Sequence, residues 1–189
     1  MPALTALRTA ETVTDAVSRS GLAAREIEEL LRQQRSRELE VVFARSLMGA
    51  WLCGPFECVR LIVETSMTLR QGRLASRWLA KLPPFCTPEN VPVALALALR
   101  ARQPTLVLTL YACFRTDLLQ LEAGMRLALA SETLHLALRT RLPKGRNGAW
   151  KKHCELLRHA YEMTASLPVE APEHRRDEAE ALRARLQEL

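Results

Sequence analysis

Aromatic residues make up only 5% of this chain of 189 residues, and it contains 7 glycines. β-Sheets favour aromatic and β-branched side chains, so this scarcity argues against a sheet protein. Leucine and alanine, both strong helix formers, dominate instead. The hydrophobic share of 48% is enough to fill a sizeable core. We therefore predict an all-α protein.

The chain also lacks paired cysteines. It has 5 cysteines, an odd number, and none of them form a C-x-x-C motif. This pattern argues against a secreted disulfide scaffold and favours buried free thiols in a reducing compartment. No apolar, signal-like stretch opens the sequence. We expect a cytoplasmic protein, or a nuclear one if the source is eukaryotic. The cysteines are Cys53, Cys58, Cys86, Cys113 and Cys154.

Catalytic motifs are missing as well. The sequence contains no glycine-rich phosphate loop, no G-x-S-x-G and no H-E-x-x-H. The nearest approach to a metal cluster is His153, Cys154 and His159, but one helix cannot gather ligands at that spacing. We therefore predict a protein that is not an enzyme, with no catalytic residues, no cofactor and no metal.

The most apolar region, residues 91–114, is interrupted by Arg100, Arg102, Gln103 and Pro104. Neither half reaches the ~20 residues that a helix needs to cross a bilayer, so we expect no membrane span. Leucines alternate with other residues at 95–99 and again at 105–111, which leaves a β-hairpin through 102–104 as an alternative. Helices are favoured because alternating Ala and Leu is strong helix-forming material.

Glycine and proline mark the expected helix ends. Gly54 followed by Pro55 is typical of a helix end followed by a new helix start. We predict that residues 45–66 form two antiparallel helices that meet there, with Trp51 and Val59 buried. Residues 85–90 and 142–148 are expected to be loops.

Three stretches, residues 45–66, 91–114 and 132–161, share the features of a helical hairpin. Each places small and apolar residues on positions of the ankyrin repeat, whose outline is T-P-L-H-x-A-A-x-x-G-H-x-x-V-V-x-L-L-L. The starts are more widely spaced than the ~33 residues of that repeat. The matching residues include Leu47, Ala50, Gly54, Val59 and Ile62 in the first stretch, Pro92, Leu95 and Ala96 in the second, and Leu134, His135 and Ala137 in the third.

The chain therefore resembles a divergent ankyrin-like array over about a third of its length; another α-solenoid or an irregular helical bundle is the alternative. The resemblance implies an irregular array of helical hairpins that acts as a non-enzymatic adaptor or scaffold for another protein. We expect one helical domain over residues 1–168. Residues 169–189 should form a charged C-terminal helix that docks on it.

The formal net charge is +6, and one segment concentrates basic residues around a tryptophan. Between residues 139 and 158 the only acid is Glu155. Such a segment suits an acidic protein surface; alternatively it binds nucleic acid, with Trp150 stacking on a base. A third reading is a solvated loop with Trp150 packed inward. The candidate binding residues are Arg139, Arg141, Lys144, Arg146, Trp150, Lys151, Lys152 and Arg158.

Overall fold

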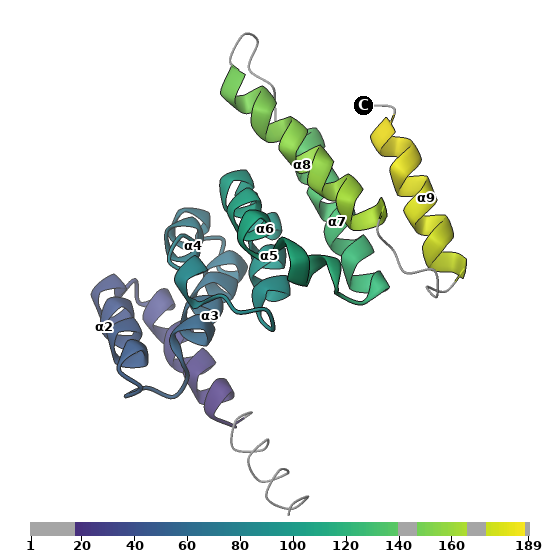
Figure 1. The fold of residues 1–189 in the computed structure, drawn as a ribbon. Helices are drawn as coiled ribbons and strands as arrows, with labels where there is room; N and C mark the ends of the chain where they lie inside the picture. The colour runs from purple at the N-terminus through teal and green to yellow at the C-terminus, as the bar shows by residue number, and fades with distance from the viewer. Residues whose placement is uncertain (1–17, 140–146, 166–172, 188–189) are drawn as a thin grey trace, which may run out of the picture. The chain divides into compact units, whose positions relative to one another are not determined.

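A computed structural model describes residues 18–139, 147–165 and 173–187. These residues form helices and short connections, and none of them belongs to a strand (Figure 1). The prediction of an all-α fold is therefore confirmed. No helix in the described ranges is both long and apolar enough to cross a membrane.

The packing divides the chain into two compact units, Met1–Phe85 and Cys86–Leu189. We call them unit 1 and unit 2. The boundary falls inside the single domain that we predicted over residues 1–168, at the start of the predicted 85–90 loop. Each unit is described by itself below.

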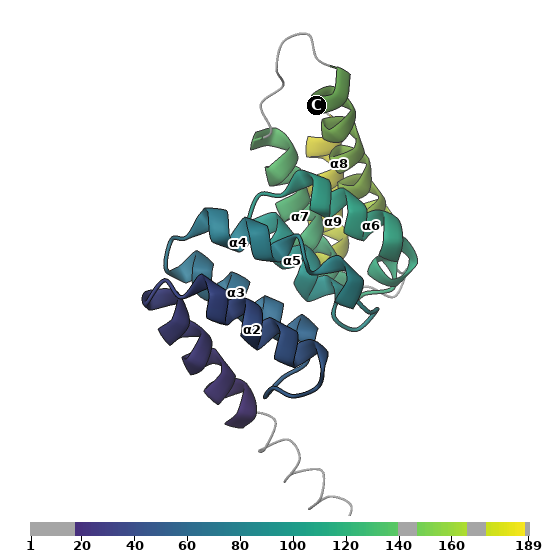
Figure 2. The same cartoon turned by 90° about the vertical axis from the view of Figure 1, so that its left-hand side faces the viewer.

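The described residues of unit 1, 18–85, form four helices and a short 3-10 turn. A helix over residues 18–32 comes first, followed by α2 (Ser36–Leu47), α3 (Pro55–Thr68), α4 (Gly72–Leu79) and η1 (Pro83–Phe85). Figure 2 shows these helices running side by side. Gly54 is the N-cap of α3 and Pro55 its first residue, as predicted.

The core of unit 1 surrounds Trp78, which is only 1% exposed. The ring of Phe43 meets the Trp78 ring edge-on, with centroids 5.5 Å apart. Lys81 covers the same indole, with Nζ 4.0 Å from the Trp78 ring. Aliphatic side chains complete the core, among them Ile27, Leu31, Leu39, Val59, Ile62 and Leu79.

The predicted hairpin over residues 45–66 is wrong in its first half. Helix α2 ends at Leu47, because Gly49 adopts a left-handed conformation with φ 68° and closes it. Trp51 was expected to be buried but is half-buried in the loop that follows, where its indole N–H donates to Glu26 at 3.0 Å. Val59, on α3, is buried as predicted.

Unit 2 contains α5 (Val91–Arg100), α6 (Pro104–Leu119), α7 (Ala123–Arg139), α8 (Asn147–Ala165) and α9 (Glu173–Gln187). The alternative β-hairpin over residues 91–112 is therefore wrong, since α5 and α6 occupy that range. Helix α9 packs against both α7 and α8, with Ala179 and Leu182 buried. The charged C-terminal segment is thus a docked helix.

The predicted start of the third hairpin at residue 132 is also wrong. Glu132 and His135 lie in the interior of α7, not at a turn. The chain breaks earlier, because the Glu122 carboxylate accepts hydrogen bonds from the backbone N–H groups of Gly124 at 3.0 Å and Met125 at 3.3 Å. These bonds cap the start of α7.

Three connections between consecutive helices share one geometry. They join the helix 18–32 to α2, α3 to α4, and α5 to α6, and each is three residues long. The central residue has a positive φ in every case, and the next backbone N–H bonds a carbonyl five residues back, which closes the preceding helix. The central residues are Gln34 (φ 56°), Arg70 (φ 58°) and Arg102 (φ 53°), and the bonds join Arg35 to Leu30, Gln71 to Ser66 and Gln103 to Ala98.

Candidate functional site

The predicted basic segment is described only in part. Arg139 ends α7 and is exposed, whereas Arg141, Lys144 and Arg146 lie outside the described residues. The other candidate residues, Trp150, Lys151, Lys152 and Arg158, all belong to α8 and are exposed. The described second half of the basic segment, residues 150–158, therefore lies on a single helix.

Trp150 is the main feature of this surface. Its side chain is 56% exposed, so the reading in which it packs inward as core is wrong. The indole stacks on the His153 ring, with centroids 5.8 Å apart and planes at 26°. His153 is held in turn by a 3.0 Å hydrogen-bond contact between its Nδ1 and the Ala137 carbonyl. This support orients the exposed indole.

A shallow hollow lies beside Trp150 on α8. It is lined by Trp150, Lys151, Cys154, Glu155 and Arg158. Residues three and four apart on a helix share a face, which explains this grouping. We call these five residues the α8 surface. It combines an exposed aromatic ring with two cationic side chains and one carboxylate.

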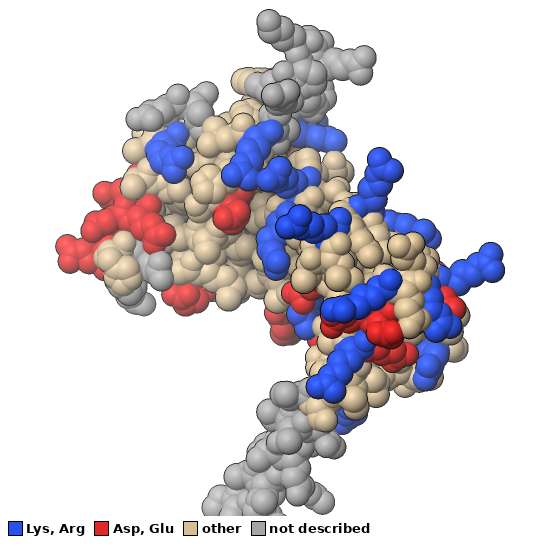
Figure 3. All heavy atoms as spheres, turned by 180° about the vertical axis from the view of Figure 1, so that it is seen from behind, with Lys and Arg blue, Asp and Glu red and all other residues tan. Residues whose placement is uncertain are grey.

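Two cations of α8, Lys152 beside the α8 surface and Arg158 within it, contact other groups of the protein. Lys152 Nζ donates to the Thr105 hydroxyl at 3.0 Å, and so links α8 to α6. Arg158 Nε lies 3.8 Å from the Glu162 carboxylate. On the face drawn in Figure 3, lysine and arginine side chains are scattered among uncharged and acidic ones.

A polar cluster joins α6 to α8 inside unit 2. The Glu162 carboxylate accepts hydrogen bonds from the Tyr111 hydroxyl at 3.2 Å and from Arg115 Nε at 3.1 Å. The His159 ring stacks on Tyr111, with centroids 3.8 Å apart. Burial, followed by Arg158, lowers the pKa of His159, and burial raises the pKa of Tyr111.

Sequence reasoning did not identify this cluster, although its members have helical spacing. Tyr111 and Arg115 are four apart on α6, and His159 and Glu162 are three apart on α8. Only the packing of α6 against α8 brings the two pairs together. A buried imidazole that stacks on a ring, beside a carboxylate that accepts hydrogen bonds from two donors, is suited to joining the two helices.

Arg126 is a second buried polar element of unit 2, and it is only 2% exposed. Its guanidinium donates to the Leu119 carbonyl at 2.5 Å and to the Met163 carbonyl at 3.1 and 3.2 Å. These carbonyls belong to the last turns of α6 and α8, where helical partners are missing. Arg126 thus caps two helix ends at once.

A cavity of unit 1 lies at two of the shared connections, and its volume is about 580 Å³. We call it the turn cavity. It is lined by Leu30, Leu31, Gln34, Ser36, Leu39, Arg70, Gln71, Gly72, Arg73 and Leu74. Nothing in the sequence pattern singled it out, because it requires two turns that are distant along the chain to lie close together.

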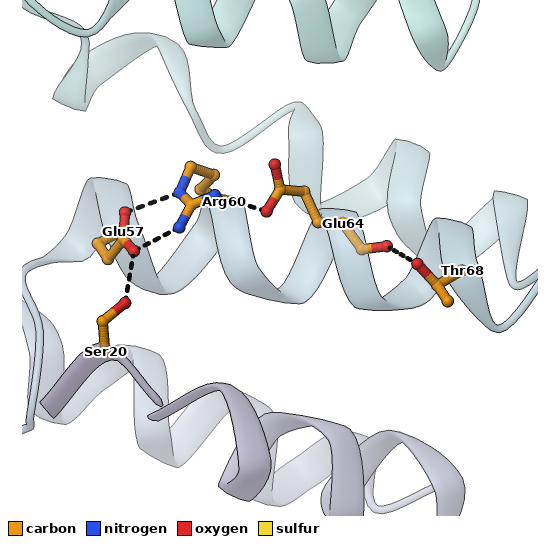
Figure 4. Close-up of polar contacts among 5 residues, drawn as sticks. All are labelled: Ser20, Glu57, Arg60, Glu64 and Thr68. Atoms are coloured by element: carbon orange, nitrogen blue, oxygen red, sulfur yellow. Dashed lines mark hydrogen bonds and ion pairs between the residues drawn. The ribbon is translucent and has the colours of Figure 1, made fainter. Parts of the chain in front are cut away.

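Elsewhere in unit 1 most charges neutralise one another. Arg60 donates to the carboxylates of Glu57 and Glu64 on the same helix, and the Ser20 hydroxyl donates to Glu57 at 3.2 Å (Figure 4). The hydrogen bonds from Arg60 lower the pKa of the Glu57 carboxyl. This network ties the helix 18–32 to α3 and leaves little charge for a ligand.

Three of the five cysteines, Cys53, Cys58 and Cys86, are partly or fully buried. Burial raises the pKa of the Cys58 thiol to about 12 and that of Cys86 to about 11. Burial also raises the pKa of Cys53. A raised pKa removes the thiolate that acts as nucleophile or metal ligand. Among the described residues, no three His, Cys, Asp or Glu side chains are placed to share a metal ion.

Comparison of this chain with protein-family models, with curated proteins and with solved structures finds no match. Its functional interpretation therefore rests on the geometry of the α8 surface and of the turn cavity.

Proposed function

We propose that this chain is a non-enzymatic interaction module that binds another protein through the α8 surface. The observation that carries the proposal is the exposure of Trp150, 56% of whose side chain faces solvent on a basic helix. Tryptophan and arginine are the residues that most often dominate binding energy at protein interfaces. Lys151 and Arg158 beside the indole favour a partner with an acidic surface, because complementary charge speeds association.

The arrangement of helices supports the same proposal. Consecutive helical hairpins with short connections are the building units of proteins that present an extended binding surface. The shared turns at positions 34, 70 and 102 are spaced close to the ~33 residues of an ankyrin repeat. This spacing supports an ankyrin-like origin, although the hairpin starts predicted at 45 and 132 do not coincide with helix starts. The resemblance stays a prediction.

Nucleic-acid binding is the second candidate, because an exposed indole with neighbouring cations also suits a single-stranded base and its phosphate. The two candidates differ in their response to salt. Binding to phosphates weakens steeply as the salt concentration rises. A contact centred on a buried tryptophan should weaken far less.

The test is capture of partners from the source organism on the full-length chain, followed by identification by mass spectrometry. The Trp150→Ala variant should capture at least ten-fold less of the specific partner than the parent chain. Tyr161→Ala is the matched control, since Tyr161 is also on α8 and 41% exposed; it should retain the partner. Binding of the purified partner at 50 and 200 mM salt then measures the charge dependence.

Two results would overturn the proposal. If Trp150→Ala and Lys151→Glu together leave capture unchanged, the α8 surface is not the interface. If nuclease treatment removes the captured protein and a labelled 20-nucleotide single strand binds with a steep salt dependence, nucleic acid is the ligand.

A further inference from the structure

We propose that the turn cavity of unit 1 is a separate binding site for a short peptide segment that presents an aliphatic side chain next to a carboxylate. The proposal goes beyond the α8 surface and does not depend on it. It combines three features of the cavity: an aliphatic floor, two arginines at its rim that have no partner within the described ranges, and the uncapped start of α4.

The floor is aliphatic. Leu30 and Leu31 come from the end of the helix 18–32, and Leu39 from the beginning of α2. All three are buried, and Leu74 on α4 is half-buried at the side. A cavity of about 580 Å³ is within the usual range for ligand pockets, in which an apolar lining is combined with a few polar groups.

The rim is cationic, and no acidic side chain lines the cavity among the described residues. Arg70 and Arg73 are exposed, and neither guanidinium has an ion-pair or hydrogen-bond partner among the described residues. Several other arginines of unit 1 are paired with glutamates. These are Arg32 with Glu28, Arg35 with Glu38, Arg60 with Glu57 and Glu64, and Arg77 with Glu40. The positive charge at the cavity is therefore available to an anionic ligand.

The start of α4 adds to this positive potential. Its N-cap, Gln71, makes no side-chain cap bond, and no acidic residue occupies its first turn. The Gln71 amide instead donates to the Leu31 carbonyl at 3.3 Å, across the cavity. The first backbone N–H groups of α4 therefore have no acceptor in the helix, and they favour a negative group.

The lining favours a peptide over a nucleic acid. None of the residues that line the cavity is aromatic, so a base would find no ring on which to stack. A leucine-like side chain suits the floor, and an adjacent carboxylate can take bidentate hydrogen bonds from a guanidinium.

The experiment uses the 15N-labelled full-length chain and a synthetic peptide, acetyl-Gly-Ser-Asp-Leu-Leu-Gly-Ser-amide, in an NMR titration. We expect saturable shifts of the backbone amides of Gly72, Arg73 and Leu74. Two control peptides, one with Asn for Asp and one with Ser for both Leu residues, should each bind at least ten-fold more weakly. Inorganic phosphate alone should also bind at least ten-fold more weakly than the peptide.

Variants assign the effect to the cavity. Arg70→Glu with Arg73→Glu should weaken peptide binding at least ten-fold, and Arg70→Gln with Arg73→Gln serves as the milder pair if the reversal disturbs folding. Arg45→Glu is the matched control, because Arg45 is another exposed arginine of unit 1 outside the cavity. Arg45→Glu should bind the peptide as tightly as the parent chain does. Trp150→Ala should also bind it as tightly, which would show that the turn cavity acts independently of the α8 surface.

The proposal is overturned if the amides of residues 72–74 show no saturable shift up to millimolar peptide. It is equally overturned if neither arginine pair weakens binding. If phosphate binds as well as the peptide, the cavity is a simple anion site and the assignment to a peptide fails.

Discussion

The two units bury different kinds of side chain. Among the described residues of unit 1, the buried polar residues are Ser46 and Ser66, and the core otherwise consists of aliphatic and aromatic side chains and Cys58. Unit 2 buries Arg126, His159, Thr133 and Thr164 in addition to its leucines and alanines. The polar contacts that join the helices of unit 1 therefore lie at its surface, whereas unit 2 packs its helices around buried polar groups.

The difference follows from how the helix ends are satisfied. In unit 1 the helices end in short turns whose backbone N–H groups bond the last carbonyls. In unit 2 the ends of α6 and α8 meet at Arg126, whose guanidinium serves both. Transferring a charged side chain from water into the protein interior costs several kcal/mol, and this cost is recovered only when hydrogen bonds satisfy the charged group.

The largest expected effect is the loss of the aromatic centre of unit 1. Trp78→Ala should lower the free energy of unfolding by about 3–5 kcal/mol, because it leaves a cavity where a fully buried indole packed. Urea denaturation followed by circular dichroism measures it. Trp150→Ala, on the exposed α8 surface, should change stability by only about 0.5 kcal/mol. Similar losses in both variants would contradict the assignment of core and surface.

A smaller effect is expected for the buried cation of unit 2. Arg126→Met should lower the free energy of unfolding by about 2–3 kcal/mol, since the Leu119 and Met163 carbonyls lose their donor. Arg60→Met in unit 1 is the comparison, because the side chain of Arg60 is 25% exposed and its pairs lie on one helix. It should cost about 1 kcal/mol or less. Equal costs in the same urea denaturation would erase the contrast between the units.

The pH dependence of stability should also separate the units. Because the pKa of His159 is lowered in the folded state, the unfolded chain binds more protons on this histidine as the pH falls through the usual range for histidine. The free energy of unfolding should therefore decrease from pH 7 to pH 5. His159→Phe should flatten this decrease. Urea denaturation at several pH values measures how the free energy of unfolding changes with pH. If His159→Phe leaves this change as it is in the parent chain, His159 is not its source.

The smallest effect concerns a feature that the units share. Gln34→Gly in unit 1 and Arg102→Gly in unit 2 should each raise the free energy of unfolding by up to about 1 kcal/mol, because glycine adopts a positive φ without steric cost. Thermal melts of the two variants, with Arg45→Gly in the helix α2 as a destabilising control, measure it. A loss of stability in either turn variant would show that the side chain contributes more than the backbone strain costs.

Sequence reasoning was most successful where local preferences act alone. The all-α class follows from the abundance of leucine and alanine, and Gly54 with Pro55 marks the start of α3 correctly. The hairpin starts at 45 and 132 failed, because they were placed by matching a repeat pattern. The actual helix ends depend on Gly49 closing α2 and on the Glu122 side chain capping α7. Caps of this kind act over a few atoms and leave only a weak trace in a sequence.

The sequence by itself determined the helical class, the basic character of the segment 139–158 and the position of Trp150 within it. Only the tertiary structure decided that Trp150 is exposed, that Tyr111 meets Glu162 across 51 positions of the chain, and that two turns line the turn cavity. The physical reason is one of range. Helix propensity and charge are properties of neighbouring residues, whereas burial and cavities are set by packing between helices that are distant along the chain.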